Sequence, residues 1–177
     1  MTHTTAALPT LGRPTISTRD IATVLFAGAL ATVAFDLFGQ FISPLMKSLA
    51  APWLGAKLAP VPLAQAVLAE VTGVPGKELR ALGIPHAMHV ITGLVAYPLG
   101  WWLIVRPIWQ RVAPSLHWTL PAIGYGIALW VFALYFMAHL VAGNPPFLGF
   151  GSITWVALWG HVIFALVAAG VIEARRT

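Results

Sequence analysis

The chain has 177 residues, of which 59% are hydrophobic and only 8% are Asp, Glu, Lys or Arg. Ordinary soluble proteins carry about 25% charged residues, and so few charges cannot coat a water-exposed surface when most residues favour burial. The composition therefore excludes a soluble enzyme and a disordered chain, and it predicts an integral membrane protein whose main partner is the lipid bilayer. The net charge of +5 is spread along the chain rather than gathered on one segment, so we expect no nucleic acid as a partner.

Four apolar segments come close to or exceed the roughly 20 residues that a helix needs to cross a bilayer. They predict an all-α, polytopic membrane protein built as a four-transmembrane-helix bundle. The expected organisation is a polar tail over residues 1–20 and a single membrane domain over 21–177. The predicted spans are residues 21–43, 86–105, 119–141 and 153–172.

The first span also has features of a signal peptide, because Arg13 and Arg19 precede its apolar run. That run is longer than an ordinary signal-peptide core, and the basic leader before it is unusually extended. We therefore expect this segment to be retained as a membrane helix.

The connection between the first two spans, residues 44–85, is too long for a simple turn. Within it, Pro62–Val71 has a helical composition, and Gly73, Pro75 and Gly76 follow as helix breakers. We predict a partly helical connection whose helix lies along the membrane surface.

Basic residues near the ends of the spans predict the orientation of the chain. With four spans, three arginine pairs share one side of the membrane: Arg13 with Arg19, Arg106 with Arg111, and Arg175 with Arg176. The opposite side carries Lys47, Lys57, Lys77 and Arg80, all in the long connection, where the rule weakens. We expect a multi-pass protein of the bacterial inner (cytoplasmic) membrane with both termini in the cytoplasm.

Small and polar residues recur at steps of three and four along each span, which is typical of helix faces that pack closely in membranes. In the third span, the face expected to point inward carries Gly124, Tyr135 and His139. The residues expected at helix contacts are Gly28, Thr32, Gly93, Gly100, Gly124 and Gly160.

The same faces carry all the ionisable residues of the spans, and these gather toward the predicted outer half: Asp36, His86, His89, His139 and His161. Asp36 and His161 each lie about seven residues, or about 10 Å, from the outer end of their helix. A charge within the membrane costs about 2.5–3.5 kcal/mol and usually faces a partner or water. We predict a histidine and aspartate cluster that binds a proton, a cation or a small ligand, with Asp36 beside a histidine.

Other interpretations of these histidines stay open. His86 and His89 are three residues apart on one helix and are compatible with a divalent metal. Two of His89, His139 and His161 are compatible with the axial ligands of a b-type haem in an electron-transfer subunit. The histidines also suit plain interhelical hydrogen bonds, as in a structural or assembly subunit that binds other membrane proteins.

The sequence contains no phosphate-binding glycine loop, no metalloprotease motif and no nucleophile elbow. It also has no cysteine, which excludes disulfides, thiolate chemistry and metal sites built on cysteine. We therefore expect a protein that is not an enzyme. The cofactor remains undetermined between haem b, a divalent metal and neither.

The carboxyl half, from about Pro85 onward, resembles the YagU-like group of small bacterial inner-membrane proteins. The resemblance rests on a span headed by His89, on the turn Gly143-Asn144-Pro145-Pro146-Phe147, and on Trp159-Gly160-His161-Val162 leading to the Glu173-containing end. It implies a four-helix protein of the inner membrane in which the equivalent of His161 is retained. It implies no particular reaction.

Overall fold

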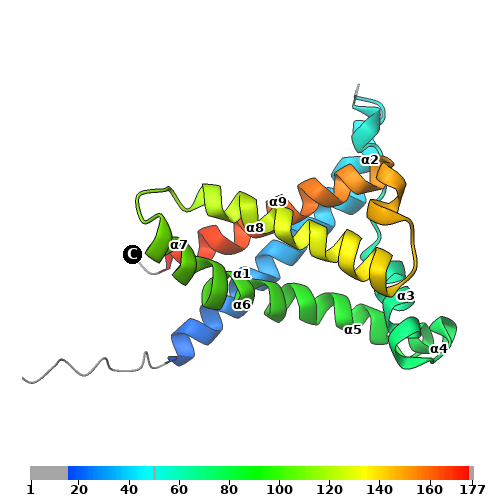
Figure 1. The fold of residues 1–177 in the computed structure, drawn as a ribbon, viewed down its shortest axis with the longest axis horizontal. Coiled ribbons are helices and arrows are strands. Elements are labelled where there is room, and N and C mark those ends of the chain that lie inside the picture. The colour runs from blue at the N-terminus through cyan, green and yellow to red at the C-terminus, as the bar shows by residue number, and fades with distance from the viewer. Residues whose placement is uncertain (1–15, 50, 176–177) are drawn as a thin grey trace, which may run out of the picture.

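The computed structural model describes residues 16–49 and 51–175, and over that range it is helical without any strand. It has four helices that are long and apolar enough to cross a membrane, which confirms the predicted four-helix architecture (Figure 1). We call them spans 1 to 4: Thr18–Met46, Ile84–Val112, Thr119–Val141 and Ser152–Ala174. Arg13, Arg176 and most of the predicted polar tail lie outside the described residues, so the predictions for them are not addressed by the structure.

Spans 3 and 4 match their predicted bounds closely, whereas span 2 continues to Val112 instead of ending at residue 105. A helix of 29 residues is about 44 Å long, which exceeds the roughly 30 Å hydrocarbon layer. The additional turns of span 2 therefore extend beyond the apolar part of a bilayer, where Arg106 and Arg111 are tolerated.

Spans 1 and 2 are interrupted by wide, π-helical turns. Each of these turns is followed closely by a proline, namely Pro44, Pro98 and Pro107. Proline lacks a backbone N–H and its ring crowds the preceding turn, so the helix widens there instead of ending. Span 1 consists of α1 (Thr18–Leu37), η1 (Phe38–Ile42) and α2 (Ser43–Met46), and span 2 of α5 (Ile84–Ile91), η3 (Thr92–Ala96), α6 (Tyr97–Gly100), η4 (Trp101–Val105) and α7 (Arg106–Val112).

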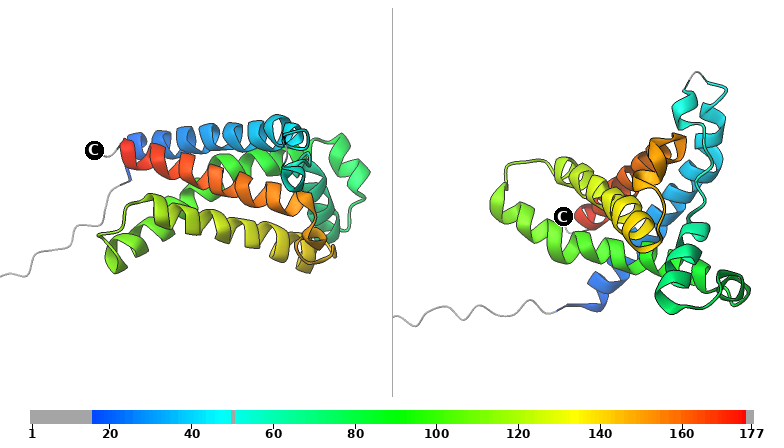
Figure 2. Two further views of the ribbon diagram at one scale, coloured as in Figure 1. Left: turned by 90° about the horizontal axis from the view of Figure 1, so that it is seen from above. Right: turned by 45° about the vertical axis from the view of Figure 1, so that its right-hand side comes forward.

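Span 3 consists of α8 (Thr119–Val131) and the π-helical η5 (Phe132–Val141), and span 4 is the uninterrupted α9 (Ser152–Ala174). The connection between spans 1 and 2 holds η2 (Pro52–Leu54), α3 (Pro60–Thr72) and α4 (Gly76–Ala81). The helix predicted over 62–71 is thus confirmed as α3, which ends at Gly73 in the left-handed conformation. In Figures 1 and 2, α3 lies across one end of the bundle rather than along its spans.

The spans pack in the order 2, 1, 4, 3. The fourth span is central: α9 packs along both α1 and α8, while α1 also packs against η3 of span 2 (Figure 2). Spans 2 and 3 meet near one end, where η4 contacts α8. Toward the other end, α5 and η5 have no extended contact with each other within the described chain, and α3 packs against both.

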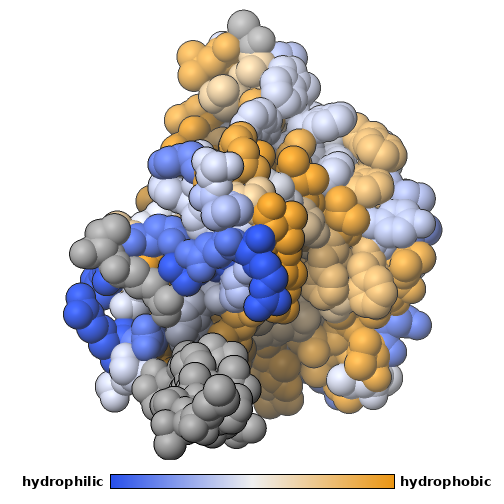
Figure 3. Space-filling model, turned by 60° about the vertical axis from the view of Figure 1, so that its left-hand side comes forward, coloured by the Kyte–Doolittle hydropathy of each residue, from blue (hydrophilic) through white to orange (hydrophobic). Residues whose placement is uncertain are grey.

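The two ends of the bundle differ in what closes them. The terminal end holds the start of span 1 and the end of span 4, as an even number of crossings requires, and the α3 end holds the long connection (Figure 1). Hydrophilic side chains gather on the face at the terminal end, flanked by hydrophobic ones (Figure 3). There Arg106 Nε donates to Glu173 Oε1 at 2.8 Å, and the buried Trp101 indole also donates to Glu173. These bonds join spans 2 and 4.

Glycines make close helix contacts at most of the predicted packing positions. A Cβ at Gly28 would collide with the backbone of Leu94, and one at Gly93 would collide with Thr32, so the predicted positions Gly28, Thr32 and Gly93 join spans 1 and 2. Gly100 lies against the hydroxyl of Tyr125, and a Cβ at Gly160 would lie 2.9 Å from the ring of Phe35.

Gly124 is the exception, and the prediction for span 3 is wrong. Gly124 is exposed, and among the described residues nothing beyond its own helix lies within 4 Å of a Cβ placed there. The glycine that packs is Gly126, where a Cβ would lie 2.6 Å from Cα of Val162 on span 4. The predicted face, which continues through Tyr135, therefore points outward, and the buried face is the one that carries Ala122, Gly126, Leu129, Ala133 and Ala138.

Candidate functional site

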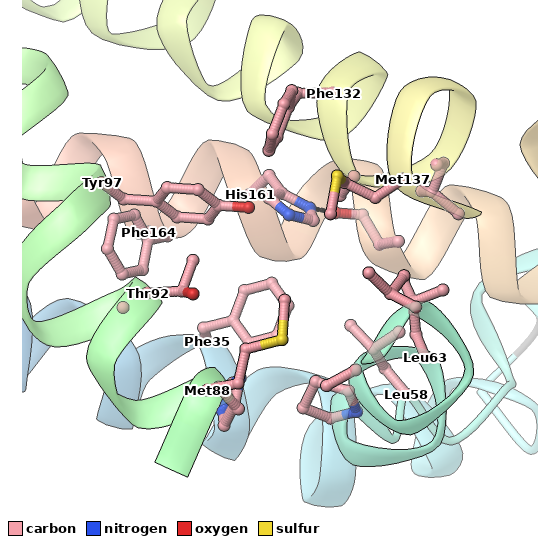
Figure 4. Close-up of a pocket in the computed structure, with 18 of the residues that line it drawn as sticks. Phe35, Leu58, Leu63, Met88, Thr92, Tyr97, Phe132, Met137, His161 and Phe164 are labelled. Carbon is pink, nitrogen blue, oxygen red and sulfur yellow. Dashed lines mark hydrogen bonds between the residues drawn. The ribbon is translucent and has the colours of Figure 1, made fainter. Parts of the chain in front are cut away.

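The bundle contains a cavity of about 410 Å³ between spans 2, 3 and 4, next to α3 (Figure 4). Its walls are mostly apolar, and all four spans and α3 contribute to them. The volume lies within the range of typical small-molecule sites, which are mainly apolar with a few placed polar groups. The polar residues that line it are Thr32, His89, Thr92, Tyr97 and His161.

His161 is the buried polar group of the cavity. It is 6% exposed, and its Nδ1 lies 2.7 Å from the carbonyl oxygen of Ala157, one turn earlier on α9. A carbonyl can only accept, so Nδ1 carries the proton, and Nε2 of the neutral ring is left with a free lone pair. Among the described residues Nε2 has no hydrogen-bond partner, and it is open to the cavity rather than enclosed by protein. His161 therefore presents an acceptor to whatever occupies the cavity.

Tyr97 supplies a hydroxyl to the same cavity. In Figure 4 its phenol points toward His161, and the centroids of the two rings are 6.3 Å apart. No hydrogen bond joins the two side chains, and the Tyr97 hydroxyl, which is open to the cavity, has no other partner among the residues described. The Tyr97 ring is held by Phe164, with ring centroids 5.6 Å apart, and its backbone carbonyl accepts a bond from Tyr125. The hydroxyl of Tyr97, which can donate, thus faces Nε2 of His161, which can accept.

Asp36 lies beside a histidine, as predicted, and the partner is His89. His89 Nε2 lies 3.2 and 3.3 Å from the two carboxylate oxygens of Asp36, and Gln40 donates to the same carboxylate at 3.1 Å. Asp36 is 31% exposed and His89 18%, so the pair lies at the rim of the bundle interior and not in its centre. Because His89 also lines the cavity, this pair links the cavity to the surface of span 1.

His86 and His139 do not join the cluster. His86 is exposed at the start of span 2. His139 donates through Nδ1 to the carbonyl of Asn144 at 2.7 Å, and Asn144 donates back to Ala138, so this histidine ties the end of span 3 to the following loop. Neither residue lines the cavity, so two of the four predicted histidines are outside the site.

The metal and haem interpretations gain no support from the geometry. Within residues 16–49 and 51–175 no group of three or more His, Cys, Asp or Glu is arranged to hold a metal ion. Of the three histidines considered for haem, only His89 and His161 line the cavity, and the ring of Phe35 packs against both, with centroids 6.3 and 5.2 Å away. His89 Nε2 is already bonded to Asp36.

The loop before span 4 is strained where it reaches the cavity. In η6 (Pro146–Phe150), the non-glycine residues Phe147, Leu148 and Phe150 all have φ between 49° and 56°, in the left-handed region that costs free energy for such side chains. Phe147 packs against Trp130 with ring centroids 4.7 Å apart and the rings tilted by 32°, and its carbonyl accepts from Thr154. The turn thereby places Leu148 in the cavity wall.

Sequence reasoning missed Tyr97 and the contribution of α3. His89, Gly93 and Tyr97 follow one another at steps of four, so the helical spacing could have placed Tyr97 on the face that carries His89. Pro60, Leu63, Ala64 and Val67 of α3 line the cavity, but nothing in their spacing indicates which part of the bundle they would cover.

Comparisons with protein-family models, with curated protein sequences and with solved structures find no match to this chain. The resemblance to the YagU-like group therefore stays a prediction.

Proposed function

We propose that this chain is an integral membrane protein that binds a small lipophilic ligand in the cavity between spans 2, 3 and 4, without transforming it. One observation carries the proposal: a mostly apolar cavity of about 410 Å³ faces two fixed polar groups, Nε2 of His161 and the hydroxyl of Tyr97, that have no partner in the described protein. Polar atoms in an apolar site cost free energy until they are hydrogen-bonded. A ligand that bonds to both removes that cost.

The apolar walls indicate that the ligand comes from the bilayer. A molecule that dissolves in lipid buries its apolar surface in the cavity and needs no charged residue to hold it, and among the described residues no lysine or arginine lines the cavity. The pair of His89 and Asp36 supplies a polar rim at which a proton can exchange between the site and the surface of the bundle. We place the protein in the bacterial inner membrane with both termini in the cytoplasm.

The proposal is tested by photolabelling the full chain in lipid nanodiscs with a small apolar probe, 3-trifluoromethyl-3-phenyldiazirine. Contact with bulk lipid gives labelling that rises in proportion to probe concentration, whereas a defined cavity saturates. We expect saturable labelling on the peptides that carry Met88 and Met137, since both side chains line the cavity.

A variant and a matched control locate the labelled site. Ala96 is exposed and lines the cavity, so Ala96→Trp fills its mouth without disturbing buried packing. Ala128 is exposed on span 3 and does not line the cavity, so Ala128→Trp adds the same side chain elsewhere. Saturable labelling should disappear in the first variant and persist in the second. Labelling that never saturates, or that Ala96→Trp leaves unchanged, would contradict the proposal.

Two measurements on the same preparation test the other interpretations of the cluster. A Soret absorption band in protein expressed with adequate haem would favour a b-type haem subunit over the ligand-binding proposal. Stable co-purification with other membrane subunits, when it is unaltered by replacement of His161 and Asp36, would favour a structural or assembly role.

A further inference from the structure

The geometry points to the class of ligand: a lipid-soluble molecule that carries a phenolic hydroxyl on an aromatic ring. This inference rests on the proposed function and adds the chemistry by which the cavity selects among lipophilic molecules. It is carried by the arrangement of Tyr97 and His161 and by the aromatic walls around them.

A hydroxyl on the ligand can bond to both Tyr97 and His161 with one oxygen atom. Its proton is donated to Nε2 of His161, whose lone pair is free because Nδ1 is bonded to Ala157. Its oxygen accepts a proton from the hydroxyl of Tyr97, which points toward His161 without bonding to it (Figure 4). Between these two side chains, Tyr97 provides one donor and His161 one acceptor, and a hydroxyl provides one of each in return.

Other polar groups match this pair less well. A ketone or an ether accepts from Tyr97 but leaves Nε2 of His161 without a hydrogen bond to the ligand. A carboxylate offers no donor to Nε2, and its charge would be buried in a cavity that no lysine or arginine of residues 16–49 and 51–175 lines. The cavity therefore favours a neutral ligand with a hydroxyl.

The walls favour an aromatic ring next to that hydroxyl. Phe35, Phe132 and Phe164 line the cavity beside the ring of Tyr97, and two methionines, Met88 and Met137, complete the wall (Figure 4). Aromatic pairs in offset or edge-to-face contact gain free energy beyond that of their buried area, and thioethers make similar favourable contacts with rings. An aliphatic alcohol would fill the same volume without these contacts.

The route to the cavity leaves room for an alkyl tail. Spans 2 and 3 meet near the terminal end but have no extended contact toward the α3 end within the described residues, and the cavity lies between them. Ala96 on span 2 and Phe132 on span 3 both line it and are both exposed on the side of the bundle. A tail on the ring can therefore lie between these spans in the lipid while the hydroxyl reaches His161.

The test compares two probes that differ by one methyl group, 4-hexylphenol and its methyl ether 4-hexylanisole, as competitors of saturable diazirine labelling in nanodiscs. The ether accepts from Tyr97 but cannot donate to His161. We expect the phenol to compete about tenfold more strongly, which corresponds to one hydrogen bond of about 1.4 kcal/mol. Equal competition by the two probes would overturn the inference and leave the proposed function standing. The absence of competition by either would count against both.

Two conservative variants assign the effect to the two side chains. His161→Phe keeps a ring but removes Nε2, so the preference for the phenol over the ether should fall from about tenfold to about onefold while the ether still competes. Tyr97→Phe removes the donor that both probes use, so both should compete more weakly and the preference should remain. Competition by the ether in His161→Phe shows that the cavity has survived the change. A preference for the phenol that persists in this variant would contradict the assignment of His161 as the acceptor.

Discussion

At the scale of single residues, the histidines of this protein differ in the partner that a ring nitrogen bonds: His139 and His161 bond through Nδ1, and His89 bonds through Nε2. His161 bonds through Nδ1 to a carbonyl of its own helix, one turn away, which leaves Nε2 free for the cavity. His139 bonds to the carbonyl of Asn144 beyond the end of span 3, which holds its ring at the loop. His89 is oriented by a carboxylate on a different span. Depth in the membrane alone does not separate these roles.

The contact of His89 with Asp36 can be measured by a double-mutant cycle. We expect Asp36→Ala and His89→Ala to be non-additive in the free energy of unfolding in detergent, with a coupling of about 0.6 kcal/mol and at most about 1.7 kcal/mol, as for other interhelical hydrogen bonds in membranes. The control cycle combines Asp36→Ala with His139→Ala and should be additive, because His139 bonds to Asn144. Coupling of similar size in both cycles would mean that the pair at the rim is not specific.

At the scale of elements, the buried face of a span depends on close backbone approach and not on where small residues are most frequent. Gly124 and Gly126 are two residues apart in α8, so they point to different sides of the helix. Only Gly126 lies against α9, where Val162 and the carbonyl of His161 approach within 2.8 Å of the position of a Cβ. The spacing of span 4 from span 3, and with it the position of His161, depends on this contact.

These two glycines provide a matched pair of substitutions. Gly126→Ala forces α8 away from the α9 backbone and should lower the free energy of unfolding by about 2 kcal/mol, the usual size of an overpacking cost. Gly124→Ala meets nothing and should leave stability unchanged or raise it by up to about 1 kcal/mol, since alanine is the better helix former. Unfolding of the purified variants in mixed micelles measures both. A larger loss for Gly124→Ala than for Gly126→Ala would invalidate the placement of span 3.

At the scale of the whole molecule, the packing order of the spans creates the cavity. Span 4 fills the centre and spans 1 and 3 pack along it, while span 2 packs along span 1. Spans 2 and 3 are therefore neighbours without extended packing over the half near α3, and α3 covers the space that they leave. Two groups that are distant in the sequence, Tyr97 and His161, face each other across this space.

The absence of cysteine allows the orientation of the bundle to be tested with single cysteines. Ser17 and Ser115 are exposed near the terminal end, and Glu78 is exposed on α4 at the opposite end. In intact cells a membrane-impermeant maleimide should label Glu78→Cys but neither Ser17→Cys nor Ser115→Cys until the membrane is permeabilised. Labelling of Ser17→Cys and Glu78→Cys from the same side would contradict a four-span topology.

The sequence by itself determined the membrane class, the four spans and the contact of Asp36 with a histidine, because these follow from hydropathy, length and the cost of an unpaired charge in lipid. The spacing also indicates the inward face of span 4, because the residues that recur there at steps of three and four are all buried: Thr154, Ala157, His161, Ala165 and Ala168. Local composition suffices for such features, since each depends on one helix and its solvent.

The tertiary structure alone decided which histidine faces the cavity, which face of span 3 is buried, and where α3 lies. Those outcomes depend on the relative placement of helices that are far apart in the chain, and span 3 offers small residues on more than one face. Hydropathy cannot distinguish an apolar face turned to lipid from one turned to a neighbouring helix, because the two environments are equally apolar. Only the packing of the spans brings Tyr97 opposite His161 and leaves an apolar space between them.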